Sequence, residues 1–362
     1  MDYSQILSQQ FNIKEEYAKN IITLLDDGNT IPFIARYRKE MHGSMDDQLI
    51  REFAEKLEYL RGLDKRRDEI RSLIDAQEKL TDEINLALDK AATLSELEDI
   101  YRPYRPKRKT RASTAKEKGL EPLANDILKQ EKGFDPSKSA VDYIDEEKGV
   151  TSVEDAIQGA MDIIAELVSD NAEIRKRIRN LTNANGVLVS VATDEEKDSV
   201  YKNYYDYKEP VKKIAGHRVL AVNRGEKEGF LKVSVETDSE KPLNSIFRAM
   251  ITDKNQLCSD IIREACTDAY QRLIYPSIER EVRNDLTDTA AENAMKVFAV
   301  NLKQLLMQPP VKGKTVLALD PGYRTGCKTA VVDSTGKVLD TTVIYPTHSD
   351  KKIQESKQTL LR

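Results

Sequence analysis

Apolar residues recur at three- and four-residue spacings along most of the chain up to about residue 180, and this spacing is typical of one face of a helix. The segment 47–78 is expected to form one long or slightly broken helix. Thr93 and Ser152 are each followed by an acidic residue three positions later, so both predict a helix start, and the second helix should extend to about Leu181. The apolar positions within 47–78 are Leu49, Phe53, Leu57, Leu60, Leu63 and Ile70.

The pattern changes at Gly186, where short runs of β-branched residues begin. Residues 187–191 and 230–235 have the composition of strands. The segment between them, 211–226, is rich in Lys and Arg and carries apolar residues at helical spacing, so it is interpreted as a helix. Together these elements predict a small α/β insertion.

Helical spacing returns after residue 240 with two apolar stripes, both of which are expected to be core. A run of apolar residues at 316–319 then predicts a buried strand that ends at Asp320, followed by two further strands up to about Tyr345. The first stripe consists of Cys258, Ile262, Ala265, Cys266, Ala269 and Leu273, and the second of Ala291, Met295, Phe298, Leu302 and Leu305.

Composition indicates a globular protein. The 362 residues are 39% hydrophobic and 33% charged, which suggests roughly two to four compact units. The start of the sequence lacks the pattern of a signal peptide and no apolar run approaches the roughly 20 residues that cross a bilayer, so a cytoplasmic location is expected. The three cysteines form no Cys-x-x-Cys pair and lie far from the three histidines, so neither a disulfide framework nor a zinc site is indicated, and no cofactor is expected.

Positive charge is concentrated between Tyr101 and Lys118. This run holds eight Lys and Arg residues against one acid, Glu117, for a net charge of +7, while the whole chain carries −5, so the other residues carry −12. Lys and Arg that neutralise phosphates supply most of the sequence-independent affinity for nucleic acid. The run therefore predicts a surface that faces a polyanion.

Two prolines, Pro103 and Pro106, bias this run away from helix, so we expect an extended basic loop between two helices. The alternative is a solvated loop whose cations pair with acids nearby, such as Glu96, Glu98 and Asp99. If the loop binds nucleic acid, its cations would contact phosphates and Tyr101 or Tyr104 could stack on an unpaired base. The candidate binding residues are Tyr101, Arg102, Tyr104, Arg105, Lys107, Arg108, Lys109 and Arg111.

Asp320 is the candidate for catalysis or metal binding. A carboxylate at the end of a buried strand, before a hairpin, is where ribonuclease H-like nucleases place a metal ligand, and an actin-like ATPase hairpin is a related alternative. Two-metal chemistry on a phosphodiester needs several converging carboxylates, and Asp333 is expected to belong to a turn. Asp320 could equally initiate a turn and have no chemical role.

Several ordered stretches resemble the Tex family of bacterial transcription accessory proteins. The resemblance implies a helical N-terminal region with helix-turn-helix character, a YqgF domain of ribonuclease H-like fold, tandem helix-hairpin-helix elements and a C-terminal oligonucleotide-binding barrel that contacts RNA. The matching stretches are residues 31–40, with the sequence Ile-Pro-Phe-Ile-Ala-Arg-Tyr-Arg-Lys-Glu, and residues 97–111, 117–123, 298–302 and 319–328.

The resemblance also implies that the chain stops inside the YqgF domain. We expect a fragment whose last fifty or so residues leave apolar faces and a sheet edge uncovered, or have them covered by neighbouring molecules. The YqgF domain of this family is generally regarded as lacking an intact nuclease site, so catalysis is not expected, and Asp320 could anchor the turn instead.

The expected fold class is mainly α, elongated and multi-helical with helix-turn-helix character, with a small α/β insertion and the beginning of an α/β ribonuclease H-like domain. The expected function is a non-catalytic scaffold of transcription that binds RNA or DNA. The alternatives are a metal-dependent nuclease that uses Asp320 and a scaffold that binds RNA polymerase or other transcription proteins. The expected parts are 1–185 as a helical N-terminal region with the basic loop at 101–111, 186–240 as the small α/β insertion, 241–308 as long helices and 309–362 as an incomplete YqgF domain.

Overall fold

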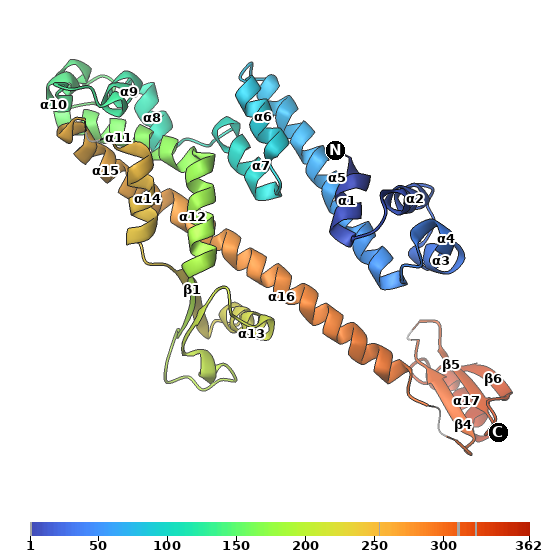
Figure 1. The fold of residues 1–362 in the computed structure, drawn as a ribbon. Coiled ribbons are helices and arrows are strands. Elements are labelled where there is room, and N and C mark those ends of the chain that lie inside the picture. Colours follow the sequence, from blue (N-terminus) through green and yellow to red (C-terminus); the bar gives the residue numbers. More distant parts are fainter. Residues whose placement is uncertain (1, 253, 310–311, 323) are drawn as a thin grey trace. The chain divides into compact units, whose positions relative to one another are not determined.

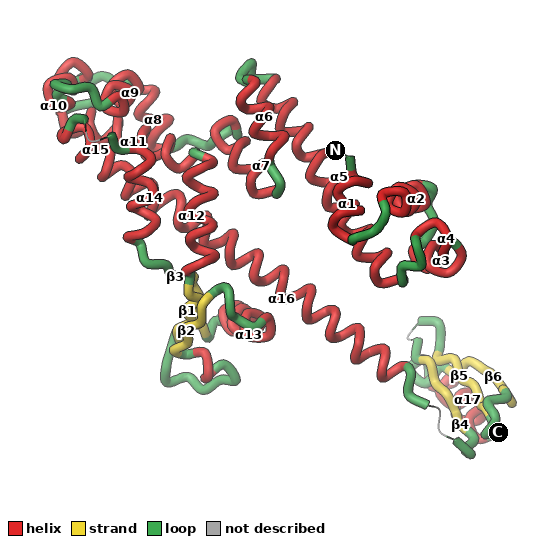
Figure 2. The backbone as a smooth tube through the Cα atoms, in the orientation of Figure 1, coloured by secondary structure: helices red, strands yellow, loops and turns green. Residues whose placement is uncertain are grey.

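The computed structural model describes residues 2–252, 254–309, 312–322 and 324–362. Helices make up most of these residues, and two three-stranded antiparallel sheets complete the described fold (Figures 1 and 2). The chain divides into two compact units, residues 1–291 and 292–362. Within the described residues, no helix combines the length and the apolar character needed to span a bilayer. The mainly helical fold class with a smaller α/β part is confirmed, and the helix-turn-helix character stays a prediction.

The first unit begins with helices that pack on the long helix α5 (Asp47–Asp75). Asp46 caps α5 by accepting a hydrogen bond from the backbone N–H of Leu49. The predicted helix at 47–78 is therefore confirmed, with its C-terminal end three residues earlier than expected. The N-terminal half of α5 shares a core with α1 (Tyr3–Phe11), α2 (Glu15–Asp26), α3 (Ile31–Tyr37) and α4 (Lys39–His42), and its C-terminal half shares one with α6 (Asp82–Lys90) and α7 (Leu94–Tyr101).

A second group of helices surrounds α11 (Val153–Asp170), which packs against α8, α9 and α15. Ser152 caps α11 as predicted. The expectation of one helix up to about Leu181 is wrong, because Asn171 has extended backbone angles and its side chain caps a new helix, α12 (Ala172–Asn185). The other helices of this group are α8 (Arg111–Glu117), α9 (Glu121–Lys129), α10 (Pro136–Ala140), α14 (Glu240–Met250) and α15 (Gln256–Asp268).

The small α/β part falls within the predicted range 186–240. Its sheet has the order β2-β1-β3, with β1 (Val187–Ala192) antiparallel to both β2 (Asp206–Pro210) and β3 (Leu231–Glu236), and helix α13 packs against β3. A helix was predicted for 211–226, but α13 covers Gly216–Lys227, so the helix begins five residues later than predicted. Strand β2 was not expected, since three of its five residues are charged and a fourth is proline, and these residue types are uncommon in strands. The division of the chain into four parts stays a prediction.

A long helical stretch links the first unit to the second: α15 continues through a π-helical turn at Ala269–Ile274 into α16 (Tyr275–Leu306). The first predicted stripe is core apart from Leu273, which is half-buried, and Cys258 and Cys266 are fully buried. Burial raises the pKa of the Cys266 thiol to about 12.

The prediction that the second apolar stripe belongs to the core is wrong. Met295, Phe298, Leu302 and Leu305 are exposed, with Phe298 reaching 66%. An apolar stripe becomes core only where a second element packs against it, and within the described residues none covers this half of α16.

The second unit contains a sheet of order β4-β5-β6 and one further helix. The strands are β4 (Val316–Asp320), β5 (Cys327–Val332) and β6 (Val338–Ile344), and helix α17 (Asp350–Leu361) packs against β6. The strand expected to be buried is present but exposed along its whole length, including Leu317 and Leu319. The burial predicted from the apolar run is therefore wrong, and the exposed residues agree with the uncovered apolar face that the resemblance implied.

The break between α11 and α12 yields a stability prediction. The Asn171 side chain accepts a hydrogen bond from the Ile174 backbone N–H at 3.0 Å. Asn171→Ala removes this cap and should lower the free energy of unfolding by about 1 kcal/mol, whereas Asn171→Asp retains an acceptor and should leave it nearly unchanged. Urea denaturation followed by circular dichroism measures both. Equal losses in the two variants would show that the cap does not stabilise α12.

Candidate nucleic-acid interface

The basic segment, defined as residues 101–111, leaves α7 through a short 3-10 turn at Arg102–Tyr104 and enters α8 at Arg111. The expected extended conformation is wrong for the first residues, and the backbone becomes extended from Arg105. Thr110 and Ser113 close the far end with a reciprocal capping box, in which each backbone N–H donates to the other side chain. The segment is therefore held at both ends by helices.

Tyr101 lies in the core shared by α5, α6 and α7, with 6% of its surface exposed. The guanidinium groups of Arg66 and Arg105 each lie 5.7 Å from the centroid of its ring. Base stacking needs an open ring face, so this structure does not offer Tyr101 for that role. Tyr104 is half-buried against the same core, and its backbone carbonyl accepts a hydrogen bond from the Gln77 side chain.

Part of the basic segment is paired with carboxylates of its own chain. Arg102 lies 3.3 Å from Asp170, which also pairs with Lys107. Glu166 lies 3.5 Å from Lys107, and Arg105 pairs with Glu98. Of the nearby acids proposed from sequence, Glu98 alone pairs with this segment in the described structure, since Glu96 pairs with Lys176 and Asp99 with arginines of α12. The inner cations thus fasten the segment to α7 and α11.

The outer cations of the segment, Arg108, Lys109 and Arg111, are exposed to solvent. Among the described residues, Arg108 has no ion-pair partner. Lys109 lies 3.7 Å from Glu117, and with 73% of its side chain exposed this pair adds little stability. Lys109 and Arg111 also line a hollow of about 450 Å³ between α8 and α11. The charge available to an external anion is therefore concentrated on these three residues.

Two acids, Asp155 and Asp162, line the same hollow. Burial raises the pKa of the Asp162 carboxyl, while the charges of Arg111 and Arg272 oppose that shift. Asp155 accepts hydrogen bonds from the backbone and the side chain of Thr151. The hollow thus contains both acids and bases. A phosphate backbone would therefore be attracted more strongly to the exposed cations of the basic segment than to the acid-containing interior of the hollow.

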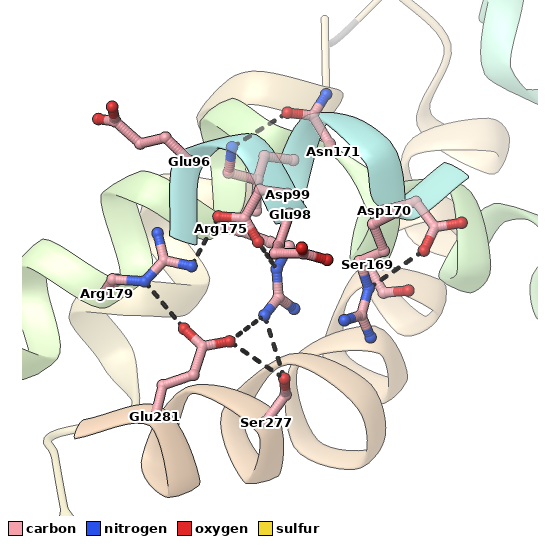
Figure 3. A network of polar contacts seen from close by, with 12 residues as sticks. Glu96, Glu98, Asp99, Ser169, Asp170, Asn171, Arg175, Arg179, Ser277 and Glu281 are labelled. Atoms are coloured by element: carbon pink, nitrogen blue, oxygen red, sulfur yellow. Dashed lines mark hydrogen bonds and ion pairs between the residues drawn. The ribbon is translucent and has the colours of Figure 1, made fainter. Parts of the chain in front are cut away.

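Beneath the segment lies a buried charge network that joins α7, α12 and α16 (Figure 3). Arg175 has 1% of its side chain exposed, and it donates to Asp99 at 2.5 Å and to Glu281 at 2.8 Å. Arg179 donates to the same two carboxylates at 2.6 and 2.9 Å. Ser277 accepts a further hydrogen bond from Arg175. Two arginines and two carboxylates therefore fix the end of α7 from which the basic segment starts.

The pKa values of Arg102, which lies next to this network, and of Arg179, which belongs to it, shift in opposite directions. Burial and the nearby charge of Arg175 lower the pKa of Arg102, against the attraction of Asp170. For Arg179 burial also acts to lower the pKa, but Asp99 and Glu281 outweigh it and the net shift is upward. The fully charged state of Arg179 is thus stabilised by the two carboxylates.

Asp320 is the exposed last residue of β4, opposite Lys328 in the sheet, and lines an open hollow of about 550 Å³. Asp333 belongs to a turn as predicted: its carboxylate accepts hydrogen bonds from Thr335 and from the Lys337 backbone, and the Thr335 bonds in particular lower its pKa. Within the described ranges, no three His, Cys, Asp or Glu side chains lie close enough together to hold a metal ion. Among the described residues that line this hollow, Asp320 is the one acid.

Comparison with known proteins identifies the family. Residues 1–75 match the Tex-like protein N-terminal domain, residues 131–298 the Tex central region, and residues 314–362 the Tex protein YqgF-like domain. These three matches follow one another in order along the chain. The protein belongs to the Tex family.

Relatives from distant organisms align with nearly the whole chain. It is 46% identical over 363 residues to the uncharacterized protein YdcI of Bacillus subtilis, covering 98% of this chain and 50% of YdcI. It is 38% identical over 356 residues to the transcriptional accessory protein Tex of Neisseria gonorrhoeae, covering 95% and 46%, respectively. The human S1 RNA-binding domain-containing protein 1 is 32% identical over 362 residues, with 95% and 36% covered. The chain spans about half the length of the bacterial relatives.

Sequence reasoning missed the residues that position the basic segment. Arg175 and Arg179 are four residues apart and so lie on one face of α12, interleaved with the buried Ile174 and Ile178. Arginines within an apolar stripe are a signal of buried ion pairs, but the sequence does not reveal their partners, since Glu281 lies more than a hundred residues further along the chain.

The buried network yields a second stability prediction. Arg175→Met retains most of the side-chain volume but leaves Asp99 and Glu281 with one arginine between them, so the free energy of unfolding should fall by about 3–5 kcal/mol. The neighbouring Lys176 is half-exposed and pairs with Glu96, so Lys176→Met should cost less than about 1 kcal/mol. Thermal and urea denaturation of both variants measure the difference. A loss for Arg175→Met no larger than for Lys176→Met would contradict a structural role for the network.

Proposed function

We propose that this chain is a non-catalytic, cytoplasmic scaffold of transcription that binds nucleic acid through the outer face of its basic segment. The observation that carries the proposal is the exposure of Arg108, Lys109 and Arg111 on a segment that both flanking helices hold in place. The names of two relatives, a transcriptional accessory protein and an S1 RNA-binding domain-containing protein, support it.

The pairing pattern assigns different tasks to the two sets of cations. Arg102, Arg105 and Lys107 fasten the segment to acids of α7 and α11, so their charge is already compensated. Arg108, Lys109 and Arg111 have weak partners or none among the described residues. Phosphate contacts of this kind position a strand without reading its sequence, so binding is expected to be sequence-independent.

A protein-interaction role is a second candidate, supported by a separate observation. Met295, Phe298 and Leu305 on α16 are exposed, and large exposed apolar patches often mark interaction sites. RNA polymerase or another transcription protein could bind there. Retention of such a partner after nuclease treatment, and its loss in a Phe298→Ser variant, would support this candidate.

The basic segment yields a binding prediction. Replacement of Arg108, Lys109 and Arg111 by Ala should reduce the log–log dependence of single-strand affinity on salt concentration by about 2, since each lost phosphate contact removes about 0.7 from the slope. Fluorescence anisotropy of a labelled 12-nucleotide oligouridylate, titrated between low and physiological salt, measures the slope.

The matched control removes the same charge elsewhere. Lys129, Lys138 and Lys148 each pair with an aspartate three residues earlier in the sequence. Their replacement by Ala changes the net charge of the chain equally and should leave the slope unchanged. The same slope in the basic-segment variant and in the wild-type protein would remove this segment from the mechanism.

A further inference from the structure

The corner between α3 and α4 exposes a cluster of cations around an aromatic ring. Arg36, Tyr37, Arg38 and Lys39 follow one another along the chain and are all exposed, with Tyr37 at 64%. Helix α3 ends at Tyr37, and the backbone angles of Arg38 depart from helical values before α4 begins at Lys39. The change of direction displays four consecutive side chains on the surface. This set of four residues is called the corner patch below.

The backbone beneath the corner patch is fixed by buried groups. Ile34 and His42 are both fully buried, and the His42 Nε2 donates to the Ile34 carbonyl at 3.1 Å. Gly43 follows with a φ of 65°, and the Tyr17 ring packs so closely on it that a Cβ would lie 2.5 Å from a ring carbon. Asn20 donates to the Met41 carbonyl. The corner therefore holds its exposed side chains on a preformed support.

Phe33 contacts both Tyr37 and Arg38 at this corner. The rings of Phe33 and Tyr37 have centroids 5.4 Å apart, and the guanidinium of Arg38 lies 5.3 Å from the Phe33 centroid. These distances fit aromatic and cation–π contacts, which restrict the freedom of the side chains involved. Tyr37 is the outermost ring and keeps most of its surface in solvent.

Within the described residues, no ion pair holds the cations of the corner patch, although the exposed Glu40 follows Lys39 directly in the chain. Arg36, Arg38 and Lys39 have no carboxylate within ion-pair distance there. This differs from the basic segment, where Asp170, Glu98 and Glu166 hold three of the cations. An ordered ring flanked by cations that no ion pair holds is a feature that binds a strand with exposed bases, since the bases stack and the phosphates pair.

We infer that the corner patch is a second binding site for single-stranded nucleic acid, in which Tyr37 stacks on a base and Arg36, Arg38 and Lys39 contact the adjoining phosphates. The inference rests on the proposed function, because it assumes that the chain binds nucleic acid. It adds a preference for single strands over duplexes, since a base within a duplex does not present its face to a tyrosine ring.

The test isolates this site by using the full 362-residue chain with Arg108, Lys109 and Arg111 already replaced by Ala. In that background, Tyr37→Ala should weaken binding of a labelled 12-nucleotide oligouridylate about tenfold, whereas Tyr37→Phe should stay within about twofold because it retains the ring. Binding of a 12-base-pair RNA duplex should not respond to Tyr37→Ala. Replacement of Arg36, Arg38 and Lys39 by Ala should lower the single-strand salt slope by about 2.

Three outcomes would overturn the inference. One is equal oligouridylate affinity for the Tyr37→Ala and parent proteins, with both folded by circular dichroism. Another is a duplex affinity that falls as much as the single-strand affinity. A third is a 12-residue polyglutamate that competes as strongly as unlabelled oligouridylate, which would indicate an acidic peptide as the ligand. The proposed function fails separately, if the basic-segment substitutions leave the salt slope of the otherwise wild-type chain unchanged.

Discussion

The placement of the candidate interface depends on the pairing of two buried arginines with two carboxylates. A guanidinium as enclosed as that of Arg175 is tolerated only where carboxylates and other acceptors surround it, because removing a charge from water without a partner is very costly. Asp99 and Glu281 meet this need from α7 and α16. The three helices are thereby held in one arrangement, and the residues that follow Asp99 leave α7 at a defined place.

The same requirement for pairing explains why a segment with a net positive charge can rest against the body of an acidic protein. Asp170 and Glu166 receive Lys107, and Asp170 also receives Arg102. These contacts are partly exposed, so each contributes less than the buried network does, but they select the side of the segment that faces inward. The cations left over face solvent. Internal acids therefore decide which basic residues an external polyanion can reach.

Sequence was sufficient for features that depend on neighbouring residues and insufficient for those that depend on distant ones. The caps at Thr93 and Ser152 and the single helix α5 follow from local spacing, and the structure confirms them. The partners of the basic segment could not be predicted in this way, because Lys107 and Asp170 are 63 residues apart and Arg175 and Asp99 are 76 apart. The stripe through Phe298 has helical spacing, but spacing alone does not reveal whether anything packs on it.

The π-helical turn at Ala269–Ile274 has a consequence for the register of everything that follows it. A wide turn accommodates about one residue more than an α-helical turn, and each residue of an α-helix corresponds to about 100° of rotation about the axis. Glu281 lies about two helical turns after Ile274, on the side of α16 that faces Arg175 and Arg179. If one residue were lost from the turn and regular winding restored, that carboxylate would swing to another side of the helix. The π-helical turn thus sets the rotation of α16 relative to α15. It lets Cys258 and Cys266 face the core while Glu281 faces the two arginines.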